Sequence, residues 1–237
     1  MARTVKDPDE RRRELLACAQ KLFYSKGYES TSVRDIVNEA GVAKGTFYYY
    51  FDSKQAILES MIDELVSYSL VLMKPIIDDP DLNATEKWIQ AFRIIADWKA
   101  DRKKELLALL EIMHSDENVL LRHKTNLITV ERLSVELAKI VAQGVDEGVF
   151  DTEFGKDAAR IALGSSITLS TTMYDLLLHP EQYDDPAALA RQKISAVQDA
   201  IERVLGAEPG SLPLAADNVF DVWFEEEKEP RMENDLI

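Results

Sequence analysis

Residues 31–54, with the sequence TSVRDIVNEAGVAKGTFYYYFDSK, constrain the fold of this chain more than any other segment. Ser32 is suited to cap a helix whose apolar residues recur at i, i+3, i+4 and i+7, counted from Val33. Gly41 then supplies the backbone freedom that a tight turn requires. A second short helix is predicted at Ala43–Tyr50. The segment therefore predicts two short helices joined by a glycine turn, followed by the capped start of a long third helix.

The second short helix has two unlike faces. Spacings of three and four residues turn Phe47, Tyr50 and Phe51 inward, where the two phenylalanines are expected to pack in the core. The outward face is small, hydroxylated and aromatic, and it comprises Gly45, Thr46, Tyr48 and Tyr49. Such a face is costly to leave in water, so it is expected to have a partner. Double-stranded DNA is the partner that we expect.

The charge of the chain looks unfavourable to this interpretation until its distribution is considered. The formal net charge is −15 at pH 7, whereas nucleic-acid-binding proteins usually carry a basic patch. Residues 1–54 carry a net charge of +2, and the remaining residues carry −17. A molecule of this kind is expected to approach DNA end-on, through its N-terminal region, because phosphate repels the acidic remainder.

The sequence also limits where the protein is expected to work. Its first residues, MARTVKDPDERRR, lack the apolar core of a signal peptide, and no stretch approaches 18 consecutive apolar residues. Cys18 is the single cysteine, so an internal disulfide is excluded. These features predict a cytoplasmic protein that does not span a membrane.

Helical patterns follow one another along the chain, and no segment is convincing as a strand. Caps, apolar periodicity, glycines and prolines mark the boundaries. The predicted helices begin and end near 8–26, 32–40, 43–50, 53–77, 83–98, 102–113, 116 to 144–148, 154–178 and 186–205. Pro75 is expected to break or end the fourth of these. The fold class predicted is all-α.

The segment TSVRDIVNEAGVAKGTFYYYFDSK, with the preceding AQKLFYSKGYESTSV, resembles the DNA-binding domain of the TetR (tetracycline-repressor-like) family of bacterial transcription regulators. The likeness covers roughly residues 10–60, and beyond that it is one of architecture only. It implies a three-helix helix-turn-helix domain at 1–54, with its motif at about 32–51. A helical ligand-binding and dimerisation domain follows at 55–210, and 211–237 form an acidic tail.

The resemblance also implies roles for individual residues at the DNA. Hydroxyl groups at the start of the second helix would meet phosphate, the recognition helix would read bases, and a lysine would flank the next helix. The residues implied are Thr31, Ser32, Arg34, Lys44, Gly45, Thr46, Tyr48, Tyr49 and Lys54. Tyr50 departs from the histidine that is common at its position.

Two long C-terminal segments, 154–178 and 186–205, carry apolar stripes. By the resemblance they would pair with their two-fold copies in a homodimer, although stripes of this kind could instead close the core of one subunit. A two-fold dimer would place two recognition helices roughly 34 Å apart and require a pseudo-palindromic operator.

The middle helices are expected to enclose a pocket for an unknown small-molecule effector. Aromatic or adaptable side chains are the candidates, although each could simply belong to the core: Trp88, Phe92, Trp98, Met113, His114, His123 and Tyr174. The helix from 53 to about 77 would reach from this pocket to the DNA-binding domain. A shift of that helix would change the separation of the two recognition helices.

The tail differs from the rest of the chain. Residues 217–237 carry 8 acidic and 2 basic side chains around the apolar run VFDVWF. The acidic composition favours disorder, whereas the apolar run could dock as a short helix on the body or on a partner subunit.

A ligand-responsive regulator, in the repressor mode usual for the family, is the function predicted. The alternative is a ligand-independent DNA-organising or protein-interaction module with the same DNA-binding domain. An enzyme is disfavoured, because no catalytic pair or cofactor loop appears. No cofactor is expected, and His114, His123 and His179 lack the spacing of metal ligands.

Overall fold

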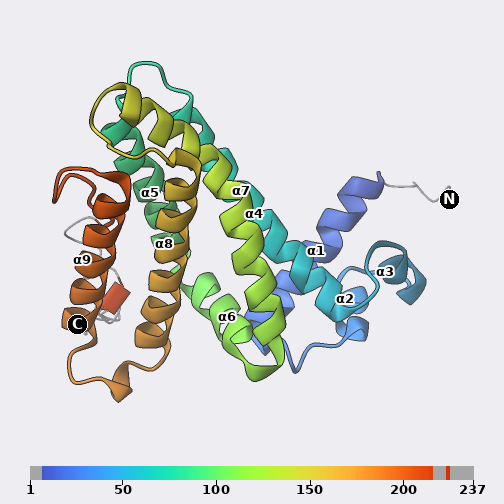
Figure 1. The fold of residues 1–237 in the computed structure, drawn as a ribbon. Coiled ribbons are helices and arrows are strands. Elements are labelled where there is room, and N and C mark those ends of the chain that lie inside the picture. The colour runs from blue at the N-terminus through green and yellow to red at the C-terminus, as the bar shows by residue number, and fades with distance from the viewer. Residues whose placement is uncertain (1–6, 216–222, 225–237) are drawn as a thin grey trace, which may run out of the picture.

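The computed structural model describes residues 7–215 and 223–224, and within that part every regular element is helical. Three helices, of which the second and third are short, lie at one end of the molecule, and a larger helical body extends away from them (Figure 1). The α-helices of residues 7–215 are α1 (Pro8–Lys26), α2 (Val33–Glu39), α3 (Lys44–Tyr50), α4 (Lys54–Ile77), α5 (Ala84–Ala100), α6 (Lys103–His114), α7 (Val119–Asp146), α8 (Gly155–Leu178) and α9 (Pro186–Leu205). The prediction of an all-α chain is confirmed. We call α1–α3 the head and α5–α9 the body.

Side-chain caps open several helices at the positions that the sequence predicts. The Ser32 hydroxyl accepts from the backbone N–H of Asp35, and the Asp35 carboxylate accepts from the N–H of Ser32 in return. Asn83 and Glu86 form the same reciprocal capping box at the start of α5. Each box satisfies two N–H groups that a helix start leaves without partners.

Pro75 does not end α4 where it occurs. The helix continues to Ile77, and the N–H of Asp78 then donates to the carbonyl oxygen of Lys74 at 3.0 Å. Proline removes one N–H donor and disturbs the preceding turn, but only two residues of helix remain after it. Because the helix ends so soon, the proline lies in its last turn instead of at its boundary.

The head has a hydrophobic core, which we call the head cluster. Its buried members are Leu15, Leu16, Ala19, Phe23, Tyr28, Ile36, Val37, Phe47, Phe51, Ile57, Leu58, Met61, Ile62, Leu109, Met113 and Leu121. Four of them come from α4, and Leu109 and Met113 come from α6. The head therefore packs on the first half of α4, on α6 and, through Leu121, on the start of α7.

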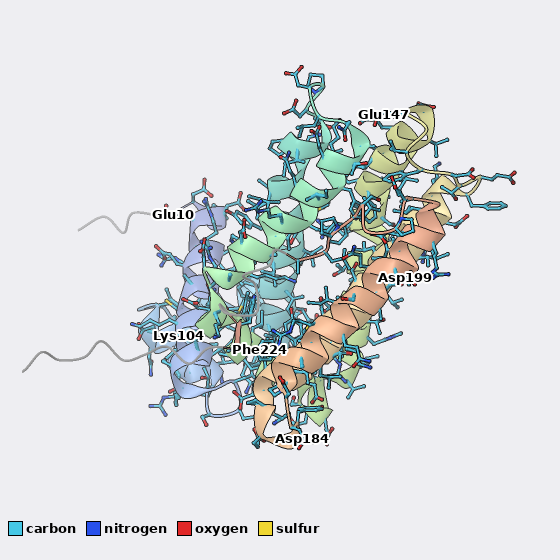
Figure 2. The ribbon with its side chains drawn as sticks, turned by 90° about the vertical axis from the view of Figure 1, so that its left-hand side faces the viewer. Glu10, Lys104, Glu147, Asp184, Asp199 and Phe224 are labelled. Carbon is cyan, nitrogen blue, oxygen red and sulfur yellow. The ribbon has the colours of Figure 1, made fainter. Side chains whose placement is uncertain are left out.

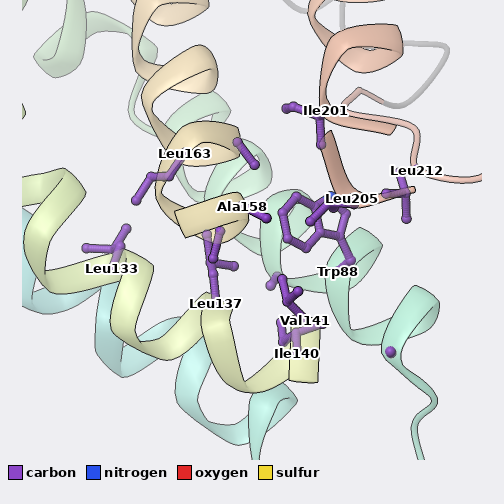
Figure 3. Close-up of a cluster of buried hydrophobic side chains, with 14 of the residues drawn as sticks. Trp88, Leu133, Leu137, Ile140, Val141, Ala158, Leu163, Ile201, Leu205 and Leu212 are labelled. Atoms are coloured by element: carbon purple, nitrogen blue, oxygen red, sulfur yellow. The ribbon is translucent and has the colours of Figure 1, made fainter. Parts of the chain in front are cut away.

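The body has its own core, the body cluster, built around Trp88 between α5, α7, α8 and α9 (Figure 3). Its buried members are Val66, Met73, Ile77, Ala84, Trp88, Ala91, Leu133, Leu137, Ile140, Val141, Phe150, Ala158, Ala159, Ala162, Leu163, Ile201, Leu205 and Leu212. The side chain of Trp88 is fully buried. Leu212 extends this cluster to the segment after α9.

α4 belongs to both cores. Ile57 and Leu58 lie in the head cluster, whereas Val66 and Met73 lie in the body cluster. Arg132 of α7 fastens the middle of α4, since its guanidinium donates to the Asp63 carboxylate at 2.7 Å and to the Ser67 hydroxyl at 2.9 Å. The predicted domain boundary at residues 54 and 55 falls at the start of this helix.

α8 and α9 expose different kinds of surface. By length and composition alone, α8 would be long and apolar enough to span a membrane. Only 17% of its most apolar 18-residue window is buried, so α8 exposes much apolar surface. On α9, the predicted stripe faces the subunit's own core, where Ala190 and Ile201 are buried and Val197 packs on the body cluster. The outer side of α9 carries charge, as Asp199 illustrates in Figure 2.

Candidate nucleic-acid interface and internal cavity

α3 divides its aromatic side chains between core and surface. Phe47 is fully buried in the head cluster, and Phe51 follows it there. Tyr48 is 47% exposed and Tyr49 is 77% exposed. Tyr50 is half-buried and meets the Tyr49 ring edge to face, with 4.8 Å between ring centroids. The structure thus presents two tyrosines to solvent on a short helix whose other face is fixed by the core.

The first turn of α3 is small and open. Gly45 has room around it, because a Cβ atom added there would meet nothing within 4 Å. Thr46 is half-buried beside it, and its backbone N–H is engaged by the carbonyl oxygen of Ala43 at 2.9 Å. Lys44 lies with its ammonium 5.7 Å from the centroid of the Tyr48 ring. A nucleic-acid backbone could approach this turn without steric hindrance from the protein.

Two cations of the head, Arg34 on α2 and Lys44 on α3, are exposed and form no ion pair or hydrogen bond within the described part of the chain. Other basic side chains of the head are engaged. Lys21 pairs with Glu39 at 2.6 Å, and Arg12 pairs with Glu64 of α4 at 3.3 Å. Arg13 of α1 is also exposed and donates to the backbone carbonyl oxygen of Asp9. Among the described residues of the head, the cations without a partner therefore lie on the two helices of the predicted motif, where a phosphate backbone could bind them.

Two of the residues implied at the DNA point into the protein. Thr31 is 2% exposed, and its hydroxyl donates to the carbonyl oxygen of Gly27 at 2.7 Å. The Lys54 ammonium donates to the carbonyl oxygen of Tyr28 at 2.8 Å and lies 3.9 Å from the centroid of the Tyr28 ring. Both residues fix the loop that joins α1 to α2. Burial also raises the pKa of Tyr28 to about 12.

Ser32 is exposed and is occupied by its role as a cap. Its N–H and hydroxyl both donate to the Asp35 carboxylate, at 2.8 and 2.7 Å. The backbone hydrogen bond from Ser32, followed by the bond from the Lys26 ammonium, holds the pKa of Asp35 well below its usual range. This network sets the angle at which α2 leaves the loop.

A cavity of about 280 Å³, partly open to solvent, lies between α4 and the body. α4, α5, α7, α8 and α9 contribute to its wall, together with the described residues of the segment after α9. Most of the wall is apolar, with Phe92, Ile95, Leu133, Leu137 and Met173 as large contributors. Ser69 and Met73 of α4 also line it, so the helix that enters the head cluster also borders the cavity.

Known proteins share both the sequence of the head and the overall fold. A model of the family described as bacterial regulatory proteins of the tetR family matches residues 15–61. The transcriptional regulator EthR of Mycolicibacterium smegmatis is 45% identical over 58 residues, which are 24% of this chain and only 27% of that protein. The transcriptional repressor KstR2 of the same organism is 28% identical over 65% of this chain and 72% of its own length. The head of this chain matches the TetR family.

The likeness to solved structures extends through the body. The crystal structure of a TetR-family transcriptional regulator from Syntrophomonas wolfei superposes with a TM-score of 0.59 and 21% identity, over 82% of this chain and 96% of that one. At this identity the superposition establishes the fold alone. The TetR architecture of a helix-turn-helix head on a helical body is confirmed.

The seven side chains predicted at an effector pocket are dispersed in the structure. Phe92 and Tyr174 line the cavity. Trp88 lies behind the wall, with its ring centroid 5.1 Å from that of Phe92, and the His114 ring lies 5.9 Å from the ring of Tyr174. The other three lie elsewhere: Met113 belongs to the head cluster, Trp98 packs on Tyr68 and Arg102, and His123 is exposed on α7.

Several cavity residues were not predicted from the sequence. Lys99 of α5, the serines of α8 and the pair Trp223–Phe224 line the cavity. Figure 2 labels Phe224 close to α9. The apolar run of the tail was a signal for Trp223 and Phe224, although Val219, Phe220 and Val222 of that run lie outside the described residues. Within the described residues, no group of three or more His, Cys, Asp or Glu could hold a metal ion.

Proposed function

We propose that this chain is a cytoplasmic transcriptional repressor that binds a pseudo-palindromic operator as a homodimer and is released by a small molecule. The observation that carries the proposal is the two-sided α3, on which Phe47 is fully buried while Tyr49 is 77% exposed. Arg34 and Lys44 lie on the same two-helix motif. The names of the TetR-family relatives, a regulator and a repressor, support this function.

Within this proposal the DNA-binding residues have two roles. Arg34 and Lys44 contact phosphate, whereas Gly45, Thr46, Tyr48 and Tyr49 enter the major groove. Thr31, Ser32 and Lys54 act by positioning, because their polar groups are engaged inside the head.

The dimer forms through the packed pair of α8 and α9, in which α8 supplies the exposed apolar surface. α8 exposes an apolar surface on which Ile161 is 54% exposed, and a Cβ added at Gly164 would meet nothing within 4 Å. A second copy packed on this face would remove its apolar surface from water, which is favourable in free energy. The inward stripe of α9 serves the core of each subunit.

The effector occupies the cavity and acts through α4. Ser69 and Met73 border the cavity, and Ile57 and Leu58 of the same helix belong to the head cluster. A ligand shifts the operator affinity only to the extent that it binds one arrangement of α4 better than the other. The cavity favours this function over the ligand-independent module.

Selection of bound fragments from a random DNA pool, at a stated salt concentration, tests the proposal. We expect an enriched sequence with two-fold symmetry and half-sites about one helical turn apart. On that sequence, Thr46→Ala and Tyr49→Ala should each lower specific affinity about tenfold and leave non-specific affinity nearly unchanged. Tyr68→Ala removes an exposed tyrosine of α4 as a control. Failure to enrich any sequence, or equal losses on all DNA, would contradict the proposal.

A further inference from the structure

The hydroxyl groups along the cavity wall are already committed as donors. Ser69, Thr129, Ser166 and Ser170 line the cavity, and each hydroxyl donates to the carbonyl oxygen four residues earlier in its helix, at distances from 2.8 to 3.1 Å. A hydroxyl has one hydrogen to donate, so these side chains offer only lone pairs to a molecule in the cavity.

Three other polar side chains on the wall retain their donors. The Lys99 ammonium, the Tyr174 hydroxyl and the Trp223 indole N–H form no hydrogen bond or ion pair within the described part of the chain. Lys99 is the single charged residue among the described residues that line the cavity, and no Asp or Glu is among them. The polar capacity that remains for a ligand is therefore donating, with one positive charge.

The charge of Lys99 stands out against the rest of the chain. Residues 55–237 carry a net charge of −17, yet the wall of this cavity carries a cation. An ammonium beside an apolar cavity is stabilised by an anion that also forms a hydrogen bond with it. Lys99 is half-buried, so a neutral ligand would offer its ammonium no opposite charge and leave it to water, and a cationic ligand would be repelled by it.

The size of the cavity limits the ligand further. A cavity of about 150 Å³ holds benzene, and the volume here is about 280 Å³. The remaining wall is apolar, so most of the ligand must be apolar as well. A nucleotide or another ligand with several charges does not match one cation and a cavity of this size.

We propose that the effector is an apolar monocarboxylate, with its carboxylate on Lys99 and its hydrocarbon body among the side chains of α5, α7 and α8. The inference rests on the proposed function in one respect, namely that the molecule bound in this cavity is the effector of the regulator. Tyr174 and Trp223 supply the two further donors for the carboxylate oxygens. Ser166 and Ser170 accept hydrogen bonds only, so they border the hydrocarbon body and do not bind the anion.

Calorimetric titration of the full-length protein with three matched probes tests this inference. Octanoate, octanol and octylamine share one hydrocarbon chain and differ in the charge of the head group. We expect octanoate to bind about tenfold more tightly than octanol, because a tenfold difference is about 1.4 kcal/mol, close to the lower end of the range for one charge-assisted hydrogen bond. Octylamine should bind most weakly, because Lys99 repels its charge. Equal affinities for octanoate and octanol, or no binding by any of the three, would overturn the inference.

Two substitutions on α5 then locate the preference. Lys99→Gln should lower the affinity for octanoate to that for octanol and leave octanol itself unchanged. Arg93→Gln removes a cation from the exposed face of the same helix, where Arg93 lies 3.8 Å from Asp97, and should change neither affinity. Persistence of the octanoate preference in Lys99→Gln would place the anion elsewhere and overturn the assignment.

Operator binding, measured in parallel on the same preparations, separates this inference from the proposed function. A protein that binds its selected DNA but shows no preference for octanoate would refute the ligand class and leave the DNA-binding function in place. A protein that binds octanoate but enriches no DNA sequence would refute the proposed regulator and leave the carboxylate site in place.

Discussion

Two threonines of the head differ in burial and in hydrogen bonding. Thr31 directly precedes the helix-turn-helix motif, and Thr46 lies within it. Thr31 is 2% exposed, and its hydroxyl is spent on the carbonyl oxygen of Gly27. Thr46 lies half-buried in the first turn of α3, next to the open position of Gly45. Thr31 therefore contributes to the stability of the head, whereas Thr46 is placed where it can contact DNA in the proposed complex.

Thr31→Val tests the structural role directly. Valine keeps the shape of the side chain but leaves the Gly27 carbonyl oxygen without its donor, so we expect a loss of about 1–2 kcal/mol in the free energy of unfolding. Urea denaturation measures this loss. DNA affinity, measured far below the melting temperature, should stay within about twofold. Unchanged stability with weakened DNA binding would assign Thr31 to phosphate instead.

At the scale of the element, the capping box of α2 links stability to pH. The Asp35 carboxylate accepts from the backbone and hydroxyl of Ser32 and from Lys26, so its folded-state pKa lies below that of the unfolded chain. The ionised form is therefore favoured by folding. Its contribution is present above the ordinary pKa of about 3.9 and is lost as the pH falls toward the folded-state pKa.

Asp35→Asn makes this dependence measurable. We expect the variant to melt at a lower temperature than the parent protein at pH 7, and the difference to shrink steadily as the pH is lowered below about 4. Thermal denaturation followed by circular dichroism at several pH values gives the curve. Asp97→Asn, on the exposed face of α5, is the control. A difference independent of pH would contradict the assigned role of the carboxylate.

The last turn of α7 requires a residue without a side chain at position 144. A Cβ atom added at Gly144 would lie 2.1 Å from the Phe150 ring, so Gly144→Ala must displace that ring. Phe150 is buried beside Trp88, with 6.4 Å between ring centroids. We expect a destabilisation of about 1–3 kcal/mol, measured by urea denaturation. Adding Phe150→Leu should recover part of the loss, and simple additivity of the two effects would contradict the steric explanation.

The helices could be predicted well from the sequence because capping residues close to each helix end set the boundaries. Ser32, Asn83 and Asp185 cap helices within a few residues of themselves, and no distant contact is needed to recognise them. The partners of each helix are a different matter. Periodicity identified the apolar stripe of α9 but could not say whether a second subunit or the subunit's own core covers it.

The candidate site shows the same division. The exposed face of α3 follows from spacing alone, so Tyr48 and Tyr49 could be found in the sequence. The inward orientation of Thr31 depends on how the α1–α2 loop closes, which no local pattern encodes. Lys99 and Trp223 reach one cavity from segments more than a hundred residues apart, and only the folded structure brings them together.

At the scale of the whole molecule, the distribution of charge and of exposed apolar surface assigns different surfaces to different partners. The net charge of +2 on residues 1–54 and of −17 on the rest leaves the head as the part that approaches DNA. The surface of α8, with Ile161 and Gly164, is the region proposed for the second copy. Because the two surfaces are separate, one subunit can bind DNA and a second copy at the same time.

Ile161→Glu tests the dimer. A carboxylate placed on the proposed interface would have to lose water, so we expect the protein to shift from dimer to monomer and lose cooperative operator binding. Sedimentation velocity at micromolar concentration gives the oligomeric state. Val135→Glu is the matched control, because Val135 of α7 is 61% exposed and Ile161 is 54% exposed. A dimer that survives Ile161→Glu but not Val135→Glu would move the interface to α7.

The shared position of α4 has a practical consequence for exchanging parts between regulators. A hybrid joined at Lys54 would separate the head from Ile57, Leu58, Met61 and Ile62, which complete its core. A junction between Ile62 and Val66 keeps those four side chains with the head that they evolved to fit. Leu109 and Met113 of α6 and Leu121 of α7 would still come from the other parent. Heads should therefore be transplantable only between parents that also agree at these three positions.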